Sequence, residues 1–107
     1  MPQPKVLNQE GKKLYLDAFL NDNFVLLLRK NTITSTPNIV FLQEKINLKI
    51  VTLNKDFLDF ENVLTNWFSK QKIDFVVIRP DKYIYDAGSL YALEKVMQYL
   101  RRRLNIK

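Results

Sequence analysis

The sequence predicts an α/β protein whose elements follow the order strand, helix, strand, helix, strand, strand, helix. Three observations indicate this order: two apolar runs of strand length at residues 24–28 and 75–78, polar turn residues bounding each run, and a long apolar stripe at helical spacing near the C-terminus. The 107 residues are enough for one hydrophobic core. With 47% hydrophobic and 26% charged residues, the composition is that of a globular domain and not of a disordered chain.

The N-terminal residues 1–12 predict a linker or a disordered N-terminus, because they hold two prolines, a glycine and polar residues without periodicity. The folded domain is expected to span residues 13–107. An apolar cluster at residues 14–19 predicts one or two helical turns. The turn signal Asn21-Asp22-Asn23 then precedes the run at 24–28, which predicts a strand buried on both faces.

The central part of the chain predicts a helix, a strand and a second helix. Thr36 and Pro37 have the residue types of an N-cap and a first helical position, so a short helix is expected over residues 37–43. β-branched residues at 48–53 predict the second strand. The next helix should begin at Asp59 or Asn62, because residues 63, 64, 67 and 68 form an apolar helical stripe.

The C-terminal part predicts a hairpin and one long helix. Residues 75–78 and 83–85 should form antiparallel strands, joined by a turn at residues 79–82 that Pro80 and Asp81 suit. Residues 86–88 should end the second of these strands, and Ser89 is a natural N-cap. The helix over residues 89–103 shows one apolar stripe: Leu90, Leu93, Val96, Met97, Leu100 and Leu104.

These elements assemble into a known architecture. The first strand-helix-strand unit must be parallel and right-handed, the hairpin adds an antiparallel edge, and helices cover both faces. This is a thioredoxin-like β-α-β-α-β-β-α sandwich with a mixed four-stranded sheet and no redox cysteines. A related α+β sandwich is the alternative topology.

The composition excludes several kinds of chemistry. Cysteine and histidine are absent, so the chain has no thiol redox centre, Cys nucleophile or His general base. Gly11 and Gly88 are the only glycines, too far apart for a phosphate-binding loop. Asp56, Asp59 and Glu61 cluster before a predicted helix, where helix-start charges are favoured over a metal or acid-base site.

The formal net charge of +6 permits a nucleic-acid partner, but much of it is local. Arg101, Arg102, Arg103 and Lys107 lie in the last seven residues, which favours a solvated basic helix end over nucleic-acid binding. No apolar run reaches membrane-spanning length, so no membrane partner is expected. No signal peptide follows Met1. A cytoplasmic location is therefore expected.

Residues 74–84, with the sequence DFVVIRPDKYI, resemble a motif of the C-terminal domain of flavin-dependent aromatic-ring hydroxylases of the phenol hydroxylase and 3-(3-hydroxyphenyl)propionate hydroxylase type. Arg79, Pro80, Asp81, Tyr83 and Ile84 match that motif one by one. Further upstream, an opening of short helix and buried strand is similar, over Gly11, Leu14, Tyr15 and residues 24–28. The chain departs from the family in its long last helix, which ends in three arginines.

The resemblance implies a thioredoxin-like fold without redox cysteines, in a parent enzyme whose preceding domains carry FAD and NAD(P)H chemistry. It supplies no catalytic, cofactor-binding or metal residue in this chain. The chain itself is therefore expected not to be an enzyme, whereas the parent is an FAD- and NAD(P)H-dependent monooxygenase.

Two interpretations of function follow. In the first, the chain is a non-catalytic accessory domain that packs on the catalytic domains of the parent or on a second subunit, and can self-associate. In the second, it is a stand-alone cysteine-free binding module that uses its basic C-terminal helix. The expected residue roles are a structural hairpin at Arg79, Pro80, Asp81 and Tyr83 and a candidate interface at Tyr85, Tyr91 and Tyr99.

Overall fold

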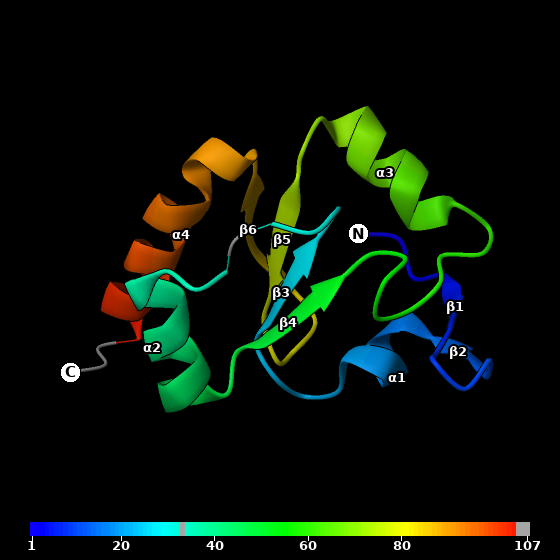
Figure 1. Cartoon of the computed structure of the whole chain (residues 1–107), viewed down its shortest axis with the longest axis horizontal. Helices are drawn as coiled ribbons and strands as arrows, with labels where there is room; N and C mark the ends of the chain where they lie inside the picture. Colours follow the sequence, from blue (N-terminus) through cyan, green and yellow to red (C-terminus); the bar gives the residue numbers. More distant parts are fainter. Residues whose placement is uncertain (33, 105–107) are drawn as a thin grey trace.

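The fold was analysed in a computed structural model, which describes residues 1–32 and 34–104. Lys107, counted above with the basic helix end, lies outside the described residues. The chain begins with two short strands and one short helix, followed by a larger unit of strands and helices (Figure 1). The elements in chain order are β1 (Lys5–Leu7), β2 (Lys13–Tyr15), α1 (Leu16–Leu20), β3 (Val25–Leu28), α2 (Pro37–Ile46), β4 (Lys49–Thr52), α3 (Val63–Gln71), β5 (Phe75–Ile78), β6 (Ile84–Gly88) and α4 (Leu90–Arg103).

The main sheet has four strands in the order β4-β3-β5-β6. Strands β3 and β4 run parallel, as their connection through α2 requires, and β5 pairs antiparallel with both β3 and β6. The predicted fold class is confirmed, including the mixed sheet and the C-terminal hairpin. Because β3 and β5 are the two central strands, both must be apolar on each face, which explains their uninterrupted apolar sequences.

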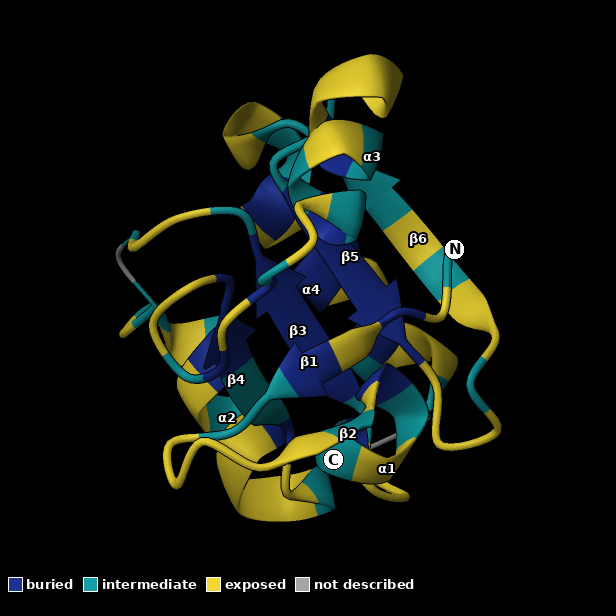
Figure 2. Ribbon diagram, turned by 90° about the vertical axis from the view of Figure 1, so that its right-hand side faces the viewer, coloured by how far each residue is buried: buried dark blue, intermediate teal, exposed yellow. Residues whose placement is uncertain are grey.

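The sheet separates two hydrophobic cores. Alternate residues of β3 point to opposite faces, so Val25 and Leu27 join the core under α1 and α3, whereas Leu26 and Leu28 join the core under α2 and α4. The central strands are buried along their whole length (Figure 2). The apolar stripe of α4 packs as its spacing predicts, with Leu93, Val96, Met97 and Leu100 buried.

The N-terminus differs from the expected linker. β1 and β2 form an antiparallel hairpin, and Val6 is fully buried in the core that α1 and α3 cover. Leu7 also exchanges backbone hydrogen bonds with Leu58, at 3.0 and 2.8 Å. Sequence analysis missed this element because β1 gains its burial from residues about fifty positions away, and a three-residue strand carries no periodic signal.

Other boundaries also differ. Residues 86–88, expected to end the fourth strand, are part of β6, which runs from Ile84 to Gly88. Tyr83, expected to begin that strand, precedes β6. α2 is longer than predicted and continues to Ile46. Leu90, assigned to the buried stripe of α4, is exposed.

Candidate functional site

The turn between β5 and β6 contains the residues that match the hydroxylase motif. The Lys82 backbone N–H donates to the Arg79 carbonyl at 2.9 Å, and the Arg79 N–H donates to the Tyr83 carbonyl at 2.8 Å. Both bonds close the four-residue turn that Pro80 favours at its second position. Lys82 has φ +73°, a left-handed conformation that completes the reversal.

Two side-chain contacts reinforce the same turn. The Arg79 guanidinium pairs with the Asp81 carboxylate at 2.6 Å, and the Tyr83 N–H donates to Asp81 Oδ1 at 3.2 Å. Arg79 and Asp81 are both exposed. The matched residues therefore contact one another, and these contacts are of the kind that hold a hairpin in shape.

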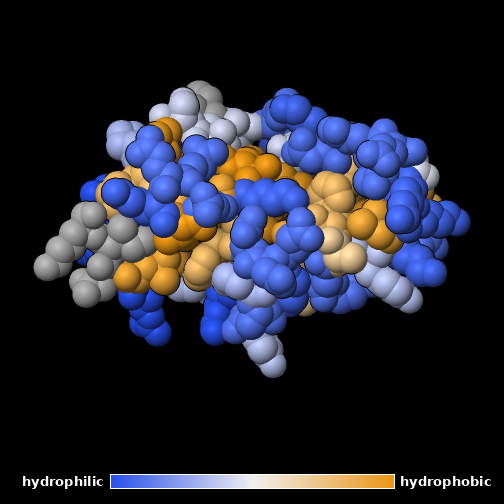
Figure 3. All heavy atoms as spheres, turned by 90° about the horizontal axis from the view of Figure 1, so that it is seen from below, coloured by the Kyte–Doolittle hydropathy of each residue, from blue (hydrophilic) through white to orange (hydrophobic). Residues whose placement is uncertain are grey.

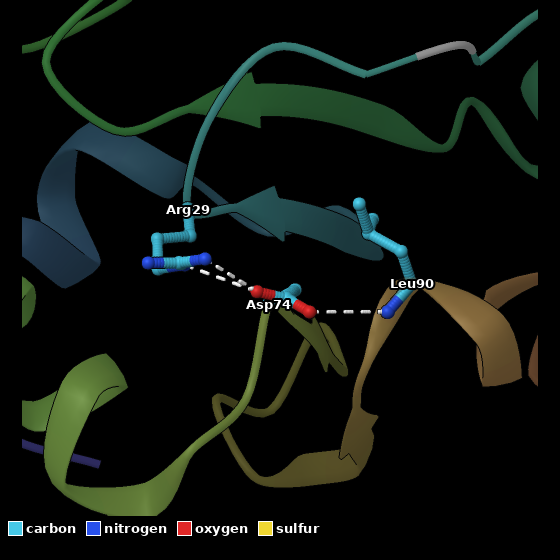
Figure 4. Close-up of polar contacts among 3 residues, drawn as sticks. All are labelled: Arg29, Asp74 and Leu90. Carbon is cyan, nitrogen blue, oxygen red and sulfur yellow. Dashed lines mark hydrogen bonds and ion pairs between the residues drawn. The ribbon is translucent and has the colours of Figure 1, made fainter.

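A second polar cluster lies where β3 ends and β5 begins (Figure 4). The Asp74 Oδ1 atom lies 2.8 Å from Arg29 Nη2 and accepts a hydrogen bond from Arg29 Nε at 3.1 Å. Asp74 Oδ2 accepts from the backbone N–H of Leu90, the first residue of α4, at 3.2 Å. One carboxylate thus joins the ends of two central strands to the start of the last helix.

This end of the sheet is where a redox-active thioredoxin carries its chemistry, in the loop between the first strand and the next helix. Here the loop after β3 begins with Arg29 and contains no cysteine. The segment directly before β5, Lys72-Ile73-Asp74, contains no proline, and no cis peptide bond occurs among residues 1–32 and 34–104. The arrangement at this end is an ion pair with a helix-terminal hydrogen bond, and not a redox site.

Sequence analysis assigned no role to Asp74, although this residue begins the segment 74–84. The predicted N-cap of α4, Ser89, has the extended backbone of a cap but makes no side-chain capping bond. Instead, the Asp74 carboxylate accepts a hydrogen bond from the Leu90 N–H, although the two residues are 16 positions apart in the sequence. Its sequence signal was a lone acid directly before an apolar strand, which indicates no partner by itself.

The three acidic residues before α3, Asp56, Asp59 and Glu61, differ in burial and in hydrogen bonding. Asp59 is buried, and its Oδ2 accepts from the Thr65 N–H at 2.8 Å and from the Thr65 hydroxyl at 3.0 Å, in the first turn of α3. Asp56 Oδ2 accepts from the Thr52 N–H at 2.7 Å. Glu61 is exposed. In the part of the chain that the structure describes, no three acidic side chains converge in a group that could hold a metal ion.

The three tyrosines of the candidate interface come from two elements and differ in exposure. Tyr91 is fully exposed at the start of α4, and Tyr99 is 45% exposed eight residues further along the same helix. Tyr85, in β6, is only partly exposed and packs against the core under α2 and α4. Tyr85 also lines a surface hollow beside the C-terminal end of α4.

The two glycines of the chain do not lie in a turn of the phosphate-binding kind, between a strand and a helix. Gly11 lies at φ +79° in the turn between β1 and β2 and precedes no helix that could hold a phosphate at its N-terminus. At Gly88, a Cβ atom would lie 3.6 Å from both Ala92 and Phe75, which is ordinary van der Waals contact, so a small side chain would fit between β6 and its neighbours. The connection from β3 to α2 contains no glycine at all.

Comparison with known proteins places the chain in a family. The family model described as HcaD C-terminal domain matches residues 1–103, nearly the whole chain. The chain belongs to the HcaD C-terminal domain family. As a member of that family, it is similar to the C-terminal domain of flavin-dependent aromatic hydroxylases, so the resemblance first indicated by Arg79, Pro80 and Asp81 is confirmed.

A solved structure shares the fold of this HcaD C-terminal domain. It is the crystal structure of a ternary complex of aklavinone-11 hydroxylase with FAD and aklavinone, with a TM-score of 0.65 and 15% sequence identity. The alignment covers 91% of this chain but 19% of the hydroxylase chain, so the domain corresponds to a minor part of that protein. A search of curated protein sequences found no match. Within residues 1–32 and 34–104, no helix has the length and hydrophobicity to span a bilayer.

Proposed function

We propose that this chain is the non-catalytic accessory domain of an FAD-dependent aromatic-ring monooxygenase, in which it packs on the catalytic domains or on a second subunit. The observation that carries the proposal is the family match over residues 1–103. The chain has the size of one domain and aligns to 19% of a hydroxylase whose structure contains FAD. The FAD and NAD(P)H chemistry then belongs to other domains of the parent, in the cytoplasm.

The chemistry of the chain supports an accessory role. Its polar clusters are engaged in holding the fold: Asp74 links strands to α4, Asp59 bonds to the start of α3, and Asp81 closes a turn. Cysteine and histidine are absent from the sequence. The chemistry expected of the parent needs a bound flavin, and the two glycines of this chain lie in the β1–β2 turn and at the end of β6, not in a glycine-rich turn between a strand and a helix.

The first experiment is a spectrum of the purified chain. We expect it to be colourless after incubation with FAD and gel filtration, and to show no oxidase or hydroxylase activity. A stoichiometric flavin absorbance band that co-elutes with the chain would contradict the proposal. The second experiment is to sequence the coding region upstream of Met1. An encoded strand, GxGxxG turn and helix would support an accessory domain, whereas an upstream stop codon would favour the alternative, a stand-alone binding module.

A further inference from the structure

A hollow of about 350 Å³ opens at the C-terminal end of α4. Phe24, Tyr85, Leu100 and Leu104 give it apolar walls, and the side chains of Arg79 and Arg103 complete its lining. We call this set of six residues the α4 hollow. The face seen from below in Figure 3 shows hydrophobic side chains gathered in a band between hydrophilic ones. The size and lining suit one large apolar side chain.

The charge around the α4 hollow is positive. Arg79 already has the Asp81 carboxylate as a partner at 2.6 Å. Arg103 is exposed, and the ion pairs found among residues 1–32 and 34–104 do not include it. Arg101 and Arg102 lie in the same last helical turn as Arg103. An occupant that brought carboxylates to this rim would neutralise an excess of positive charge.

We propose that the α4 hollow is the anchor point for an acidic protein segment that carries a large apolar side chain between carboxylates. This inference rests on the proposed accessory function and names the chemistry of the surface that the domain would meet. Interfaces are commonly held by one apolar or aromatic side chain in a pocket, surrounded by a polar rim. Phe24 and Leu104 would contact the apolar group, and Arg103 would meet the flanking carboxylates.

Two other occupants agree less well with the same residues. In a symmetric pairing of two copies through this surface, the arginine-rich end of one α4 would face that of the other, and like charges repel. Single-stranded nucleic acid needs stacking platforms along a cationic groove. Tyr91, the fully exposed aromatic of α4, is 12 residues from Arg103, or about 18 Å along the helix. Phe24 and Tyr85 are partly buried in the hollow, and Tyr99 is the one half-exposed aromatic within a helical turn of Arg103, so the described residues form no row of exposed rings beside this rim.

The test is a titration of the ¹⁵N-labelled chain with a blocked peptide, Glu-Glu-Phe-Glu-Glu, followed by amide chemical shifts. We expect the shifts to concentrate on the residues of the α4 hollow. Replacing Phe with Ser in the peptide should abolish them. Arg103→Glu should weaken binding about fivefold or more. Arg102→Glu is the matched control, because it makes the same charge change in the same exposed helical turn without lining the hollow, and it should have a smaller effect.

Four results would overturn the proposal. These are equal weakening by Arg102→Glu and Arg103→Glu, equal binding of the serine peptide, preferential binding of a five-nucleotide oligothymidylate to the same residues, and peptide binding seen only after residues 105–107 are deleted. The last result would mean that the end of the chain itself competes for the hollow. Absence of any peptide binding would overturn the proposal as well, and it would leave the accessory function intact with a different contact surface. If an upstream stop codon contradicts the accessory function, peptide binding would instead be evidence for a stand-alone binding module.

Discussion

Arg29 and Asp74 form an ion pair of 2.8 Å at the point where β3 ends and β5 begins. Their backbones are also joined, because the Arg29 N–H donates to the Asp74 carbonyl at 2.9 Å. The pairing of Leu28 with Phe75 in the neighbouring register position brings the two residues opposite each other. The antiparallel pairing of β3 with β5 thus brings Arg29 and Asp74 together. The second carboxylate oxygen of Asp74 accepts a hydrogen bond from the first residue of α4.

Substitution of Asp74 with Asn should destabilise the domain by about 1 kcal/mol, because it weakens two contacts. A partly exposed ion pair contributes less than about 1 kcal/mol, and a charge-assisted hydrogen bond at a helix start contributes about 1 kcal/mol. The reference variant is Asp22→Asn, since Asp22 is exposed and lies 3.9 Å from Lys82. We expect urea unfolding to show a lower free energy of unfolding for Asp74→Asn and almost no change for Asp22→Asn. Equal midpoints for all three proteins would show that the contact contributes nothing to stability.

Asp59 should matter more than its acidic neighbours. Its carboxylate is buried and accepts from both the N–H and the hydroxyl of Thr65, so Asp59→Ala would leave these two partly buried donors without this partner. We expect a loss of about 1–3 kcal/mol in the free energy of unfolding. Glu61→Ala, at an exposed position of the same loop, should change it by less than about 0.5 kcal/mol. Thermal and urea unfolding of the two variants would separate a structural bond from general charge effects.

An element of this fold could be predicted from the sequence where its pattern depends on residues close together in the chain. β3, β5 and α4 were predictable because central strands are apolar on both faces and a long helix repeats its buried stripe. β1 was not predictable, because Val6 becomes buried only when the hairpin folds back over α1 and α3. Two of the site's contacts are also non-local: Asp74 reaches Leu90 across 16 residues, and Arg29 across 45.

The motif turn shows the opposite case, a local feature that neighbouring residues determine. Pro80 and Asp81 were expected to suit a turn at residues 79–82, and the structure has that turn, with the Arg79 guanidinium and the Tyr83 N–H both bonded to the Asp81 carboxylate. Arg101 behaved differently. It was assigned to the solvent face of α4, but its guanidinium lies 3.7 Å from the centre of the Phe41 ring, because α2 packs beside α4. Helix periodicity shows which face of a helix is apolar, but not which neighbouring helix a residue at the edge of that face will contact.

Replacement of Pro80 with Ala should reduce stability by about 0.4–1 kcal/mol, chiefly by increasing the conformational entropy of the unfolded chain. Both backbone bonds of the turn use N–H groups of other residues, so the substitution removes no hydrogen bond. The predicted signature is a lower unfolding midpoint with an unchanged fold by NMR. The structural role of this turn would be refuted if Arg79→Ala abolished binding of a specific small ligand while the melting temperature stayed the same.

Association of the isolated domain should strengthen with salt. A domain separated from its neighbours exposes surface that they would cover, and Tyr83, Tyr91 and Tyr99 are large exposed groups of this kind, at 70%, 100% and 45% of their maximum. The arginines at the end of α4 oppose contact between copies at low ionic strength, and salt screens that repulsion. Nucleic-acid binding has the opposite dependence, because added salt removes the gain from counterion release. Sedimentation equilibrium at low and moderate salt, with and without an oligonucleotide, distinguishes the two. A chain that stays monomeric at both salt concentrations and gains mass only with the oligonucleotide would favour the binding module over the accessory domain.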